Sequence, residues 1–148
     1  DAFSTAESDG CRVKVLIGTY NETVSPIVDD ITNVSYFDVQ LEAGKSFQYS
    51  LPETQNSLLY IFEGEGEFKG QPVSNDTLIT LGEGDNDFSF TAGSLGARLL
   101  LISGKPIDEP FVQYGPFVMN SREEIDQAMR DFHNNNFVRD KAWVNRKK

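Results

Sequence analysis

The chain has 148 residues, with 13 Lys and Arg, 23 Asp and Glu and one histidine, so its net charge is −10. This length fits one domain of ordinary size with a core of its own. The acidic balance disfavours direct binding to nucleic acid or to an anionic membrane, because both need a positive protein surface. The longest apolar run, Leu58 to Phe62, is five residues, whereas a membrane-spanning helix needs about 20.

Short apolar segments separated by turn residues follow one another along the first two thirds of the chain. Residues 1–10 are small and polar and predict a linker or disordered tail. The segments after them are typical of an all-β sandwich or barrel, and closure into a barrel is favoured because open edges invite aggregation. The predicted strands cover residues 12–17, 36–41, 46–51, 57–62, 77–81, 87–91 and 98–102.

The pattern changes after Gly104. Residues 105–120 begin as a Pro-bracketed linker and continue as an extended segment that is apolar on both faces. A helix is predicted over 121–134, because Ser121 and Glu124 have capping-box spacing and an apolar stripe follows them at helical intervals. Residues 137–148 form a basic tail with five basic residues and one acidic residue. We therefore expect a single folded domain over 11–136.

Several motifs that could carry chemistry have simpler structural explanations. The glycines of 64–66 imitate a dinucleotide-binding loop, but no helix follows them and a β-hairpin turn is favoured. Ser94 is expected in another hairpin turn, without the full nucleophile-elbow pattern. The acidic runs 63–67 and 83–87 are expected to be solvated turns. His133 has no second imidazole with which to share a metal ion.

Cysteine usage bears on the compartment. Cys11 is the only cysteine, so the chain cannot form an internal disulfide. This favours a reducing environment, and we expect a cytoplasmic location, with the nucleus as an alternative in a eukaryote.

Three stretches of the sequence resemble the pirin family. The run Gln113-Tyr-Gly-Pro-Phe-Val-Met-Asn120, with the Ser-Arg-Glu-Glu-Ile that follows it, resembles the C-terminal segment of pirins. The stretches 36–44 and 60–66 also look like the second pirin domain. Pirins are bicupins, so the resemblance implies a cupin-type double-stranded β-helix, or jelly-roll barrel, with one C-terminal α-helix. It also implies that iron is expected only in a pirin N-terminal domain. Several members of the family are linked to quercetin dioxygenase activity, and some eukaryotic members act as nuclear cofactors of transcription regulators.

The cupin motif spacing locates the positions that would hold metal ligands in this chain. Gly44 and Gly64 match the two glycines of the first motif. None of the four ligand positions carries an imidazole, thiolate or carboxylate donor, so no cofactor is expected in this chain. These vacated ligand positions are Ser50, Pro52, Ser57 and Gly96.

Three functions compete. The resemblance favours a metal-free domain with a structural role, which packs on an N-terminal cupin domain or self-associates as a dimer. The first alternative is that the chain is part of an iron-dependent quercetin 2,3-dioxygenase, although the chain alone is expected to lack that activity. The second is a module that binds a small apolar ligand or a protein such as a transcription factor. The candidate interface residues are Phe111, Gln113, Tyr114, Phe117, Met119 and Trp143.

Overall fold

The computed structural model describes residues 3–27, 29–82 and 86–138. The chain divides into two compact units, Asp1–Ile107 and Asp108–Lys148. Within the described residues, no helix is long and apolar enough to cross a membrane. The elements are β1 Ser4–Ser8, β2 Cys11–Ile17, β3 Thr19–Tyr20, β4 Thr23–Val24, β5 Ser35–Leu41, β6 Ser46–Ser50, β7 Asn56–Phe68, β8 Gln71–Ser74, β9 Thr77–Leu81, β10 Asp87–Gly104, β11 Val112–Tyr114, β12 Phe117–Met119 and α1 Arg122–His133.

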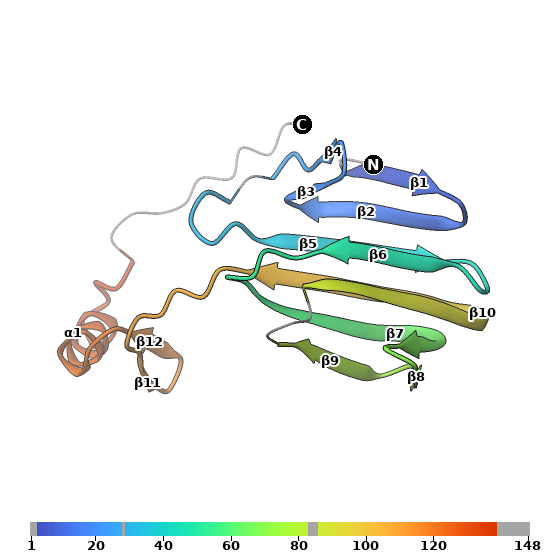
Figure 1. Cartoon of the computed structure of the whole chain (residues 1–148). Helices are drawn as coiled ribbons and strands as arrows, with labels where there is room; N and C mark the ends of the chain where they lie inside the picture. Colours follow the sequence, from blue (N-terminus) through green and yellow to red (C-terminus); the bar gives the residue numbers. More distant parts are fainter. Residues whose placement is uncertain (1–2, 28, 83–85, 139–148) are drawn as a thin grey trace. The chain divides into compact units, whose positions relative to one another are not determined.

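The prediction of an all-β fold with one helix near the C-terminus is confirmed, and each predicted strand overlaps an observed one. The prediction of a linker over 1–10 is wrong for Ser4–Ser8, which form β1 and pair with β2 (Figure 1). The turn between them is Asp9-Gly10, and both residues have positive φ. An Asp-Gly pair is a strong signal for a two-residue hairpin turn, so the turn between β1 and β2 was predictable from the sequence.

The strands of the first unit form two layers, and two long, bent strands connect these layers. β7 has 13 residues and β10 has 18, and β10 turns sharply in its middle (Figure 1). Between the pairs Ala92↔Gly66 and Ala97↔Gly64, four residues of β10 lie opposite the single residue Glu65 of β7. The hairpin turns predicted at 64–66 and around Ser94 are therefore wrong, because the glycines bend these strands without ending them.

The two halves of each long strand belong to different layers. One layer has the order β1-β2-β5-β10-β7-β9, and the other contains β6, β10, β7 and β8. Among the described strands, pairing leaves these layers open at their edges and does not close them into a ring. The core between the layers is largely apolar, because alternate residues of the central strands β2, β5, β7 and β10 point inward. Its largest fully buried side chains are Phe37, Phe47, Phe90, Leu59, Ile61, Leu99, Leu101, Val13, Val15 and Val39.

The second unit is a small hairpin packed on a helix. β11 and β12 pair in register, and α1 begins after the N-cap Ser121, whose capping box with Glu124 is present as predicted. A separate small core forms here around Phe117, Ile125 and Ala128. The extended segment and the helix, expected within the cupin domain, thus form a compact unit with its own core.

Candidate functional site

The four vacated ligand positions do not converge on one point. Ser50 and Pro52 are exposed at the end of β6 and in the turn after it, whereas Ser57 is buried in β7. Ser57 pairs with Ser103 of β10, and Gly96 lies beside the other end of that half-strand. Ser103 lies six positions after Ala97 in β10, which corresponds to roughly 20 Å of strand. Donors this far apart cannot share one metal ion, since metal–ligand bonds are about 2 Å long.

Gly96 has no room for a side chain. Its φ is +74°, and a Cβ built on it would lie 2.6 Å from the carbonyl oxygen of Leu41. A histidine at this position would therefore require the neighbouring backbone to move. The residue that the cupin motif needs as a ligand is excluded here by backbone packing as well as by chemistry.

Ser57 takes part in a buried hydrogen-bond chain. Its hydroxyl donates to Ser103 Oγ at 2.7 Å, and the Ser103 hydroxyl donates to Gln55 Oε1 at 2.6 Å. Ser103 is 1% exposed and Ser57 is 7% exposed. Both hydroxyl protons are used within the protein, so this cluster is satisfied without a ligand.

Aromatic rings fill much of the space between the two layers of the first unit. Phe37 and Tyr49 meet edge to face with centroids 5.2 Å apart, and Phe47 stacks on Tyr49 at 6.3 Å. Tyr20 contacts all three of these rings. At the far side, Phe88 joins Phe47 to Phe68. This close-packed interior is a core rather than a polar cavity.

The acidic and other metal-ligating side chains that the structure describes in the first unit are dispersed. Among the described residues, no group of three or more His, Cys, Asp or Glu side chains is placed so that it could hold a metal ion. The acidic run 63–67 lies within β7 rather than in a turn, and Glu63 pairs with Arg98 at 3.9 Å. Of the second acidic run, 83–85 lie outside the described residues.

The single-residue candidates have local partners. The Ser94 hydroxyl donates to Glu65 Oε1 at 3.3 Å, so the nearest group is a carboxylate and no imidazole is involved. His133 Nδ1 donates to the Met129 carbonyl oxygen at 2.7 Å, within the last turn of α1. Cys11 is half-buried at the start of β2, and burial raises the pKa of its thiol, which disfavours the reactive thiolate.

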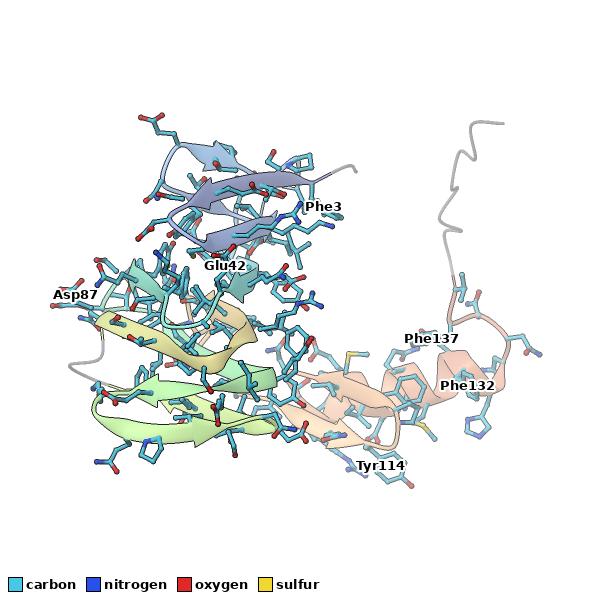
Figure 2. The ribbon with its side chains drawn as sticks, turned by 90° about the vertical axis from the view of Figure 1, so that its right-hand side faces the viewer. Phe3, Glu42, Asp87, Tyr114, Phe132 and Phe137 are labelled. Carbon is cyan, nitrogen blue, oxygen red and sulfur yellow. The ribbon has the colours of Figure 1, made fainter. Side chains whose placement is uncertain are left out.

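The candidate interface residues in the second unit differ in their exposure to solvent. Phe117 is 9% exposed because it packs on α1, and Met119 is partly buried against the same core. Phe111 and Tyr114 are exposed, at 75% and 51%, and Gln113 is also exposed. Trp143 lies outside the described residues. Figure 2 shows the exposed Phe132 and Phe137 close to each other in this unit, and their ring centroids are 6.5 Å apart.

A second group of surface residues was not anticipated. On the outer face of the layer that contains β5, β10, β7 and β9, large apolar side chains stand next to one another across the strands. The signal was present in the continuous apolar runs 58–62 and 99–102, which leave no polar face on either strand. A strand with one solvated face normally alternates between apolar and polar residues.

Comparison with known proteins agrees with this architecture. Residues 36–138 match the protein family described as "Pirin C-terminal cupin domain". The chain is 40% identical over 147 residues to a pirin-like protein of Solanum lycopersicum, covering 95% of this chain and 50% of that protein. It is 37% identical over 134 residues to Pirin-1 of Arabidopsis thaliana, covering 87% of this chain and 46% of that protein.

A solved structure shares the fold. The crystal structure of quercetin 2,3-dioxygenase from Acinetobacter baumannii superposes with a TM-score of 0.82 and 26% sequence identity, over 92% of this chain and 48% of that one. The chain therefore spans about half the length of the relatives that it matches.

Proposed function

The chain belongs to the pirin C-terminal cupin domain family, and we propose that it is the metal-free half of a bicupin protein, with a structural role. In this role it packs on a first cupin domain, which carries the iron that the family resemblance implies. The chain itself then supplies a rigid, filled β-sandwich and no ligand to the metal. We place it in the cytoplasm, in keeping with its single cysteine.

One observation carries this proposal: the donor set at the cupin ligand positions. Ser50 and Pro52 face solvent, the Ser57 hydroxyl is engaged with Ser103, and Gly96 has no space for a side chain. Iron in proteins of this kind needs imidazole or carboxylate ligands in a convergent arrangement. The residues present do not fit such a metal.

Metal analysis tests the proposal directly. The purified chain is incubated with Fe(II) under anaerobic conditions, desalted and measured by elemental mass spectrometry, with the full-length Solanum lycopersicum relative treated in the same way. We expect far less than one iron per chain here. Stoichiometric iron that survives desalting would contradict the metal-free assignment.

Quercetin dioxygenase activity is the second candidate, and it is supported by the Acinetobacter baumannii structure, which shares this fold over half of its length. If the activity belongs to the whole protein, the chain alone should not consume oxygen with quercetin. A flavonol-binding role for this domain is tested by thermal shift, because a ligand that binds only the folded state raises its stability. We expect no shift across a panel of flavonols, and a saturable shift would favour the ligand-binding module instead.

A further inference from the structure

β7 and β10 are apolar on both faces over the layer that they share with β5. Leu59 and Ile61 of β7 point into the core with no exposure, so Leu58, Tyr60 and Phe62 point to the opposite, outer face. On β10, Leu99 and Leu101 point inward in the same way. Strands that are buried on both faces have continuous apolar sequences, whereas a strand face that contacts water carries polar residues. The outer face therefore has the composition of a covered surface.

The outward side chains form one continuous patch. Ile102 pairs in register with Tyr36 on one side and with Leu58 on the other, and Leu100 pairs with Tyr60. Directly opposed side chains on one face of a sheet lie about 5 Å apart, within contact distance. We call this surface the outer patch, and it consists of Tyr36, Leu58, Tyr60, Phe62, Leu100, Ile102 and Leu78. Leu78 is 57% exposed, and the other six residues are half-buried.

A border of paired charged side chains adjoins the outer patch. The Arg98 guanidinium lies 4.9 Å from the centroid of the Phe62 ring and pairs with Asp38 at 3.0 Å. Its Nε is buried and has no hydrogen-bond partner. Arg98 also lines a groove with Arg12, Lys14 and Asp38, and Arg12 pairs with Glu7 at 2.9 Å, so basic and acidic side chains alternate beside the outer patch. A charged border of this kind favours a partner with complementary charges at the rim of its own apolar surface.

We propose that the outer patch is the surface on which the first cupin domain of the bicupin protein docks. This inference rests on the proposed function, and it assigns that function to one face of the first unit. The relatives are about twice as long as the chain, so they contain a second portion of comparable size. A partner of that size can cover a patch that extends across four strands. The apolar centre supplies the burial energy, and the charged border sets the orientation of the partner.

A cleavable chimera tests the proposal. This chain replaces the matching half of the Solanum lycopersicum pirin-like protein, and a protease site is placed at the junction. After cleavage, size-exclusion chromatography and titration measure whether the two halves remain associated. The test variant is Tyr60→Thr/Leu100→Thr, because threonine suits an exposed strand face and preserves the fold. The matched control is Leu95→Thr, at a leucine that is 82% exposed in the bend of β10.

We expect the unmodified halves and the Leu95→Thr control to stay together. The double variant should weaken their association by about tenfold or more, with unchanged circular dichroism and thermal unfolding of the chain. If the unmodified halves separate after cleavage, the proposed packing role itself is wrong. If the double variant still associates like the control, only the assignment to the outer patch is overturned.

Two further measurements test whether the second unit provides the contact surface and whether a second copy of the chain is the partner. Phe111→Ser/Tyr114→Ser in the same chimera would weaken association only if the second unit provides the contact, which would overturn the outer-patch assignment. Sedimentation of the isolated chain tests for a dimer formed through the outer patch. We expect no dimer that disappears in the Tyr60→Thr/Leu100→Thr variant. A patch-dependent dimer at micromolar concentration would make a second copy the occupant and would contradict the proposal.

Discussion

Gly64 and Gly96 touch at the point where the two long strands bend: a Cβ on Gly64 would lie 2.2 Å from the carbonyl oxygen of Gly96. Both residues have positive φ, +81° and +74°. The two layers are joined at this contact, because β7 and β10 pass from one layer to the other there. Any side chain at Gly64 would push the strands apart at the bend.

Replacing Gly64 with alanine should therefore destabilise the fold strongly. The expected loss is about 3 kcal/mol or more, since left-handed backbone strain adds to a clash with backbone atoms. Gly70→Ala is the matched control, because Gly70 also has positive φ but a Cβ there would meet nothing within 4 Å. It should lose only about 1 kcal/mol. Urea unfolding of both variants gives the comparison, and equal losses would contradict the close approach.

The direction of the Ser57–Ser103–Gln55 hydrogen bonds predicts unequal effects at the two serines. Ser103→Ala leaves the buried Ser57 hydroxyl without its acceptor and Gln55 without its donor, so it should cost about 2 kcal/mol. Ser57→Ala leaves the Ser103-to-Gln55 bond in place and should cost about 1 kcal/mol. Chemical denaturation of the single variants and of the double variant measures both. A larger loss for Ser57→Ala would show that the chain of bonds runs differently.

Asp29 makes the stability of the first unit sensitive to acid. Hydrogen bonds from the Thr32 side chain and from the backbone of Val34 and Ile31 lower the pKa of Asp29 below its usual 3.8. Because the folded pKa is the lower one, the stabilisation is complete above the unfolded pKa. It is lost as pH falls through about 4 and below, towards the folded pKa.

Asp29→Asn should remove this dependence. Its unfolding free energy should fall less between pH 6 and pH 3 than that of the unmodified chain, because no carboxylate is left to protonate at this site. Asp30→Asn, at the next residue, is the control and should retain the steeper acid response. Thermal unfolding monitored at both pH values provides the measurement, and identical responses in the two variants would exclude Asp29 as the source.

The capping box predicts the stability of α1. The Glu124 N–H donates to Ser121 Oγ, and the Ser121 N–H donates to Glu124 Oε2 at 2.9 Å. Ser121→Ala should destabilise the second unit by about 1 kcal/mol. Amide hydrogen exchange in α1 detects this locally, with Glu123→Gln as a control in the same helical turn. Unchanged exchange in Ser121→Ala would mean that the cap contributes nothing in this context.

The Cys11 thiol should react slowly. Burial raises its pKa, so at pH 8 the thiolate fraction is smaller than in an exposed cysteine. We expect iodoacetamide to modify the folded chain several-fold more slowly than the chain in urea. Mass spectrometry of timed samples follows the reaction. Equal rates in the two conditions would show that the thiol is not protected by burial.

The sequence by itself determined most of the local structure and the family. Alternating segments located the strands, capping-box spacing located α1, and the pirin-like stretches indicated the domain that residues 36–138 match. It also listed which side chains stand at the cupin ligand positions. These features depend on residues close together in the chain, where periodicity and turn chemistry are directly readable.

Only the tertiary structure decided what the glycines and the apolar runs do. Gly64 and Gly96 could be read as turns, because each has the same local signal whether a strand ends or bends. Their mutual contact, more than 30 residues apart in sequence, shows that they bend strands that continue. In the same way, the run Leu58 to Phe62 shows a strand without a polar face, but its register with β10 is what assembles the outer patch. Cross-strand neighbours are set by pairing between distant segments, and pairing is a property of the folded sheet.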